Sequence, residues 1–72
     1  MKFDKSIVAR NSIKVFHLMK GMYHYTFDDL QVESKLNDTD LCLAIGQLMQ
    51  EGKLRQVRNS SGIYYAIDVF RS

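Results

Sequence analysis

Two spacings of apolar residues divide this chain near residue 52. Before that point apolar residues recur every three or four positions, which is typical of amphipathic helices, and after it they approach every second position, which is typical of strands. We predict helices from about Ser6 to Lys20, from Phe27 to about Leu36, and from Asp38 to Glu51. The C-terminal part predicts a hairpin, with the sequences KLRQVRN and IYYAIDVF as its strands and SSG at its turn.

The expected helix boundaries carry recognisable end signals. Gly21 should end the first helix, and the short aromatic segment Met22–Tyr25 is predicted as a minimal strand. Thr26 can cap the second helix, with Asp29 at the capping-box position, and Asn37 can cap the third. Gly52 should close the third helix. The second and third helices, joined so briefly, are expected to form a helix-turn-helix.

The periodicity also predicts which side chains are buried. The expected core comprises Val8, Ser12, Val15, Phe16 and Met19 from the first helix, Phe27, Leu30 and Ser34 from the second, Leu41, Ala44, Ile45 and Leu48 from the third, and Ile63, Tyr65, Ile67 and Val69 from the last strand. Gln56 and Val57 interrupt the alternation of the preceding strand, which predicts a bulge or a slipped register there.

The segment LNDTDLCLAIGQLMQEGKL resembles the core of a family of small stand-alone winged helix-turn-helix proteins, a domain of unknown function, and IKVFHLM in the first helix is similar too. The sequence departs from that family at Gln56 and in the tail DVFRS. The resemblance implies an α+β winged helix fold with the order α-β-α-α-β-β, in which the C-terminal hairpin is the wing. With 72 residues, we expect residues 1–72 to form a single domain.

Composition and charge narrow the class of protein. A hydrophobic share of 46%, the absence of any long apolar run and a single cysteine, Cys42, favour a cytoplasmic protein with no membrane partner. The net charge of +2 is unevenly divided: residues 27–51 carry six acidic residues and one lysine, a net −5, whereas residues 1–26 carry +4 and residues 52–72 carry +3. The helix-turn-helix is therefore acidic and its flanks are basic.

One functional hypothesis is DNA binding, as a transcriptional regulator or an accessory to one. The residues predicted to face outward and contact bases are Thr39, Gln47 and Gln50, and those predicted to hold phosphates are Lys53, Arg55 and Arg58. The third helix, however, contains no arginine or lysine and begins with Asp38 and Asp40, which phosphates repel. Any binding should therefore come mainly from the wing.

The alternative hypothesis is a winged helix that contacts protein and does not bind DNA. Leu43 is expected at the outward centre of the third helix beside Gly46, whose helix-interior position costs about 1 kcal/mol relative to alanine unless a close approach compensates. Equally, Leu43 fits an ordinary surface leucine, and Gly46 could admit a neighbouring core side chain. The first helix has an unusually wide apolar arc, with Ile7 and Leu18 at one edge and Ile13 at the other. We expect a homodimer, with the wide first helix and the tyrosine-rich last strand as its contact surfaces. The individual residues predicted at a protein interface are Ile7, Ile13, Leu18 and Leu43.

Catalytic and metal chemistry find no support in the sequence. His17, His24 and Cys42 lack the short spacing of structural zinc ligands, and there is no glycine-rich phosphate loop or nucleophile-base pattern. We therefore predict no enzyme activity, no metal, no cofactor and no small-molecule substrate.

Overall fold

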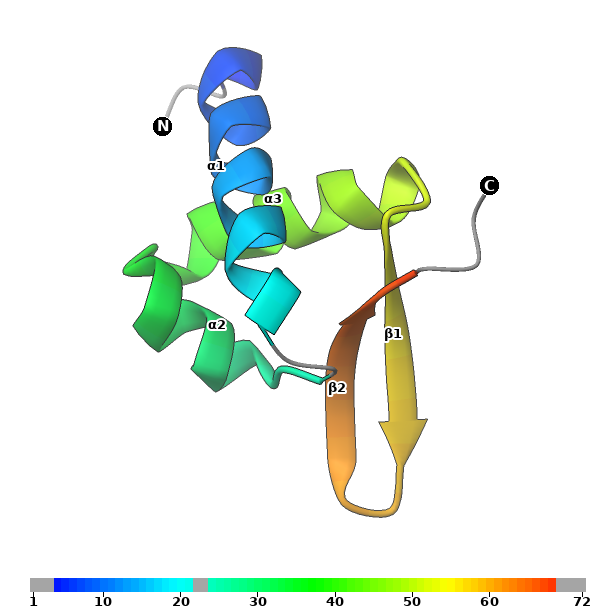
Figure 1. The fold of residues 1–72 in the computed structure, drawn as a ribbon. Helices are drawn as coiled ribbons and strands as arrows, with labels where there is room; N and C mark the ends of the chain where they lie inside the picture. Colours follow the sequence, from blue (N-terminus) through cyan, green and yellow to red (C-terminus); the bar gives the residue numbers. More distant parts are fainter. Residues whose placement is uncertain (1–3, 22–23, 69–72) are drawn as a thin grey trace.

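Three helices precede a two-stranded antiparallel sheet in the computed structural model, which describes residues 4–21 and 24–68 (Figure 1). The elements are α1 (Lys5–Leu18), a 3₁₀ turn (Met19–Gly21), α2 (Phe27–Ser34), α3 (Asp38–Gln50), β1 (Leu54–Asn59) and β2 (Gly62–Ile67). The predicted α+β arrangement is confirmed. No helix in the described ranges is long and apolar enough to span a membrane.

Side-chain caps define the helix starts as predicted. Thr26 and Asp29 form a reciprocal capping box at the start of α2, and the Asn37 side chain accepts a hydrogen bond from the Asp40 backbone N–H at the start of α3. At the end of α3, Gly52 takes a positive φ of 75°, and the backbone N–H of Lys53 donates to the Leu48 carbonyl at 2.9 Å. This is a Schellman motif, which turns the chain from α3 into the wing.

Side-chain hydrogen bonds from α2 and α3 stabilise the turn between these two helices. Lys35 ends α2 in a left-handed conformation with φ 63°, so α2 stops at Ser34, two residues before the predicted end. The buried Ser34 hydroxyl accepts from the Leu36 backbone N–H at 3.2 Å, and the Gln31 side chain donates to the Asp38 carboxylate. Asp38 therefore has a structural role in the turn.

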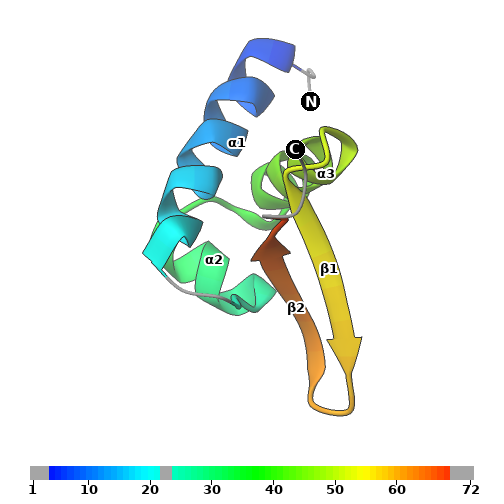
Figure 2. The same ribbon diagram turned by 45° about the vertical axis from the view of Figure 1, so that its right-hand side comes forward.

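The core lies between the three helices and the base of the wing (Figure 2). α1 packs most extensively on α3 and also contacts α2. Most of the predicted helix core is confirmed, because Val8, Ser12, Val15, Met19, Leu30, Ser34, Leu41, Ala44, Ile45 and Leu48 are all buried. Phe16 and Phe27, also predicted in the core, are partly buried and pack against it. Leu54 joins this cluster from β1, with Tyr65 and Ile67 packed against it from β2.

The wing is more regular than predicted. All six residues of β1 pair with β2 in one register from Leu54↔Ile67 to Asn59↔Gly62, so the expected bulge or slip at Gln56 is wrong. A two-residue connection, Ser60–Ser61, closes this ladder, and Gln56 is simply exposed opposite Tyr65. Ile63 is not inward as predicted: it lies near the tip, beyond the helices, and is 41% exposed. Val69 lies outside the described residues.

The predicted strand Met22–Tyr25 reduces to a single bridge in the described residues, since Met22 and Tyr23 fall outside them. Tyr25 pairs with Tyr65, each backbone N–H donating to the other's carbonyl at 2.9 and 2.7 Å. The α2 cap at Thr26 follows at once, so the pairing does not continue beyond Tyr25 in the C-terminal direction. The Tyr25 hydroxyl also donates to the Leu18 carbonyl at 2.8 Å, so this residue links α1 to β2.

Candidate nucleic-acid interface

The predicted base-contacting residues of α3 do not act alike. Thr39 and Gln50 are exposed, as expected. Gln47 is half-buried, and its side-chain amide is already engaged: Nε2 donates a hydrogen bond to Glu51 Oε2 at 2.7 Å. The structure thus engages the Gln47 amide within α3 itself.

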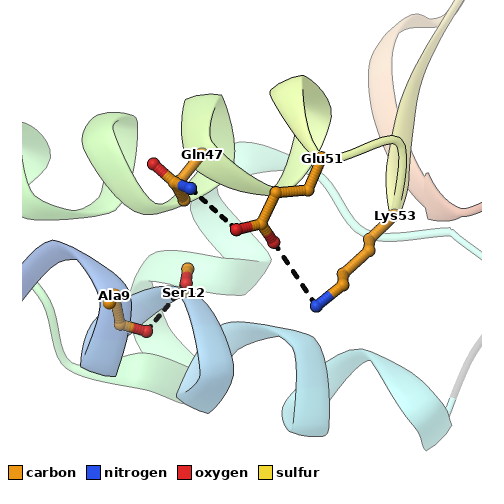
Figure 3. A network of polar contacts seen from close by, with 5 residues as sticks. All are labelled: Ala9, Ser12, Gln47, Glu51 and Lys53. Atoms are coloured by element: carbon orange, nitrogen blue, oxygen red, sulfur yellow. Dashed lines mark hydrogen bonds and ion pairs between the residues drawn. The ribbon is translucent and has the colours of Figure 1, made fainter.

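Glu51 also holds the first cation of the wing (Figure 3). Lys53 Nζ lies 3.4 Å from Glu51 Oε1 and 5.8 Å from the centre of the Phe16 ring of α1. The hydrogen bond from Gln47 and the neighbouring Lys53 ammonium lower the pKa of the Glu51 carboxyl below its ordinary value of 4.5. Two of the six predicted nucleic-acid contacts therefore converge on one carboxylate. Sequence reasoning missed Glu51, although its spacing of four from Gln47 and two from Lys53 was a readable signal.

A hollow of about 660 Å³ separates the N-terminal half of α1 from the C-terminal half of α3. It is lined by Lys5, Val8, Ala9, Gln47, Gln50 and Glu51. Both glutamines thus border α1 as well as the outer surface. Gln47 is half-buried at this position and is the less accessible of the two, whereas Gln50 is exposed.

Arg55 and Arg58 of β1 have a different environment. Both are exposed, and within the described ranges neither makes an ion pair. Because residues an odd number apart in a strand point to opposite faces, the two guanidinium groups lie on opposite sides of the wing. Unlike Lys53, these two predicted phosphate contacts are not engaged by a carboxylate within the described ranges.

The four predicted protein-contact residues do not form one surface. Ile7 is 44% and Ile13 57% exposed, at opposite edges of the buried stripe of α1. Leu18 and Leu43 are half-buried. Three further large apolar side chains are exposed among the described residues: Val32 of α2, Met49 of α3 and Ile63 of β2.

Gly46 is exposed at the centre of α3, and a Cβ atom built on it would meet nothing within 4 Å. The interpretation that Gly46 admits a neighbouring core side chain is therefore wrong. Nothing within the described residues offsets the helix propensity that this glycine gives up.

A helix-turn-helix preceded by a helix and followed by a β-hairpin defines a winged helix-turn-helix protein. Residues 3–66 match the sequence profile of a family described as winged helix-turn-helix domain (DUF2582), and the chain belongs to this family. It is similar to protein BT2368 from Bacteroides thetaiotaomicron, solved by solution NMR: the TM-score is 0.82, the sequence identity 26%, and the match covers 97% of this chain and 90% of that one. No curated protein matches the sequence.

Proposed function

We propose that this protein binds nucleic acid mainly through its wing, with Arg55 and Arg58 as the principal phosphate contacts. The observation that carries this proposal is that both are exposed and unpaired within the described ranges, on a hairpin that projects from the helices (Figure 1). Phosphate neutralisation supplies most of the affinity of non-specific complexes. The wing carries the positive charge that neutralises phosphate, whereas α3 contains no lysine or arginine.

The opposite orientations of the two arginines suit a groove with phosphates on both sides. If the wing enters such a groove, Arg55 faces one phosphate row and Arg58 the other. Lys53 adds less, because Glu51 holds it, and Asp38 and Asp40 repel phosphate at the start of α3. Recognition by shape and charge therefore fits this surface better than base reading by Thr39, Gln47 and Gln50. A role as a transcriptional regulator would then need a further source of sequence specificity.

Fluorescence anisotropy with a labelled duplex at several salt concentrations tests the proposal. Two phosphate contacts predict a slope of log K against log salt of about −2 for wild type, and Arg55→Ala or Arg58→Ala should each reduce its magnitude by about 1. Both variants should weaken binding similarly on unrelated sequences.

Lys35→Asn is the matched control, because it removes an exposed cation from the far end of α2 and asparagine tolerates the left-handed backbone there. It should leave binding nearly unchanged. Absence of binding in low salt, even at high micromolar protein, would exclude the nucleic-acid function.

The second candidate is a protein-interaction domain that does not bind DNA. It is favoured by Ile7 and Ile13, which expose apolar surface on α1 beyond what the core uses. This function predicts self-association or partner binding that survives Arg55→Ala and Arg58→Ala. Sedimentation of those variants without nucleic acid separates the two functions.

A further inference from the structure

Gly46 stands at the centre of a symmetric surface on α3, and this surface points to a specific partner. Leu43 and Met49 lie three residues to either side of it, and Cys42 and Gln50 lie four residues to either side. At 3.6 residues per turn these positions surround Gly46 on one face, opposite the buried stripe of Leu41, Ala44, Ile45 and Leu48. Leu43 is half-buried, and the other three are exposed. We call these five residues the α3 face.

The absence of a Cβ at Gly46 allows another helix to approach there more closely than elsewhere along α3. Among the described residues no contact requires this glycine, since a Cβ would meet none of their atoms within 4 Å. Alanine would favour the helix by about 1 kcal/mol. A close contact with another molecule would account for a glycine at this position.

The charges beside the α3 face favour a second copy of this chain in antiparallel orientation. α3 begins with Asp38 and Asp40, whereas the segment 51–55 at its end carries Glu51, Lys53 and Arg55, a net +1, with Lys53 paired to Glu51 and Arg55 making no ion pair within the described ranges. Two α3 helices that cross antiparallel at Gly46 bring the acidic start of each toward the basic segment of the other. A parallel arrangement would instead oppose acid to acid. An interface made of apolar contacts alone would not favour the antiparallel over the parallel orientation.

We propose that two copies form a two-fold symmetric dimer by packing α3 against α3′, crossing at Gly46. A two-fold contact is self-complementary, so each pair occurs twice. Leu43 then faces Met49 of the other copy, and Cys42 faces Gln50 of the other copy. α3 is thereby withdrawn from any DNA groove, while both wings stay accessible. The proposal deepens the protein-interaction function by naming partner and surface, and it does not depend on nucleic-acid binding.

Sedimentation equilibrium without nucleic acid is the first test. Wild type should show twice the 8.4 kDa mass of one chain at high micromolar to millimolar concentration. Gly46→Arg should raise the dimer dissociation constant at least about tenfold, as expected for obstruction at the centre of an interface. Val32→Arg, which places the same side chain on the exposed surface of α2, should leave the dimer intact.

A crosslink to the native Cys42 provides a second, independent test. In Gln50→Cys the two sulfurs of one chain lie about 12 Å apart along the helix, too far for a disulfide within that chain. In the proposed dimer Cys42 faces position 50 of the other copy, so mild oxidation should give a covalent dimer on non-reducing gels. Adding Cys42→Ser should abolish it. This arm also decides the matter if Gly46→Arg does not fold.

A wild-type mass of one chain at millimolar concentration overturns the dimer and, with it, this inference. A dimer that Gly46→Arg leaves unchanged, and that Gln50→Cys does not crosslink, overturns the α3 face while leaving a protein contact through α1. Loss of DNA binding in the wing variants affects neither result. The failure of this inference and that of the wing proposal are therefore distinguishable.

Discussion

Single side chains of this protein have local partners that decide what they can do. Gln47 and Lys53 looked like nucleic-acid contacts by residue type, yet both are bonded to Glu51 at the junction of α3 and the wing. Gly46 shows the opposite case, because no atom in the described part of the chain lies within 4 Å of the position where its Cβ would be. The first pair is occupied within the chain, and the glycine is open to contact from outside.

Glu51 predicts a measurable pH dependence. Its pKa is lowered in the folded protein by the Gln47 hydrogen bond and by Lys53, so its contribution to stability is present above its ordinary value of 4.5 and is lost as pH falls through the lower folded value. Below pH 4.5, the urea midpoint of wild type should therefore fall relative to that of Glu51→Gln. Parallel profiles for the two proteins across this range would refute the assignment.

The two glycines with open surroundings should respond oppositely to alanine. Gly46→Ala, measured where the chain is monomeric, should raise the free energy of unfolding by about 0.5–1 kcal/mol, because α3 gains helix propensity without a clash. Gly62→Ala should lower it by roughly 1–3 kcal/mol, since φ there is 137°, a conformation that side chains strain. Denaturant unfolding of both variants checks the pair, and equal signs would contradict it.

Whole elements were predictable from the sequence where their signals are local. The caps at Thr26 and Asn37 and the stripes of α1 and α3 depend on residues a few positions apart, and the structure has them as expected. The wing register was mispredicted because the alternation breaks at Gln56 and Val57, although the ladder runs through both residues without a bulge. The Tyr25 bridge joins residues 40 positions apart, Tyr25 and Tyr65, which periodicity does not encode. For the same reason the solvent-exposed position of Ile63 was not predicted: strand alternation gives the face, but not how far the helices reach along it.

Tyr25 links α1 to β2, and its hydroxyl should contribute to stability. The side chain is 6% exposed and donates to the Leu18 carbonyl at 2.8 Å. Tyr25→Phe leaves that carbonyl short of a partner in a partly buried place and should lower the free energy of unfolding by about 1 kcal/mol. Tyr64→Phe is the matched control, because within the described ranges the Tyr64 hydroxyl makes no hydrogen bond, and its urea midpoint should hardly move.

For the molecule as a whole, the division of charge matters more than the net charge of +2. The segment 27–51 carries −5 between flanks of +4 and +3, so copies of the chain can attract one another at close range although each is positive overall. The same basic flanks attract phosphate. Self-association therefore uses the attraction between the acidic segment and the basic flanks, whereas nucleic-acid binding uses the basic flanks alone.

This distribution predicts how salt affects the proposed dimer. Raising NaCl from about 50 mM to about 0.5 M shortens the Debye length from roughly 14 to 4 Å and should weaken self-association, because the paired acidic and basic ends are screened. An interface held by apolar contact alone would be unaffected or strengthened. Sedimentation of wild type at the two salt concentrations distinguishes these outcomes.

The bridge between Tyr25 and Tyr65 fixes the base of the wing to the helices and leaves its outer part free to bend. At Tyr65, β2 lies between β1 on one side and Tyr25 on the other, whereas the hairpin beyond that residue, as far as Ser60–Ser61, is exposed for most of its length. Amide hydrogen exchange should therefore slow from the tip to this bridge, with Tyr25 and Tyr65 among the slowest. A nucleic acid bound at the tip would bend the outer part of the wing. The displacement would reach the C-terminal end of α1 through the contacts that Tyr25 makes with Tyr65 and with the Leu18 carbonyl.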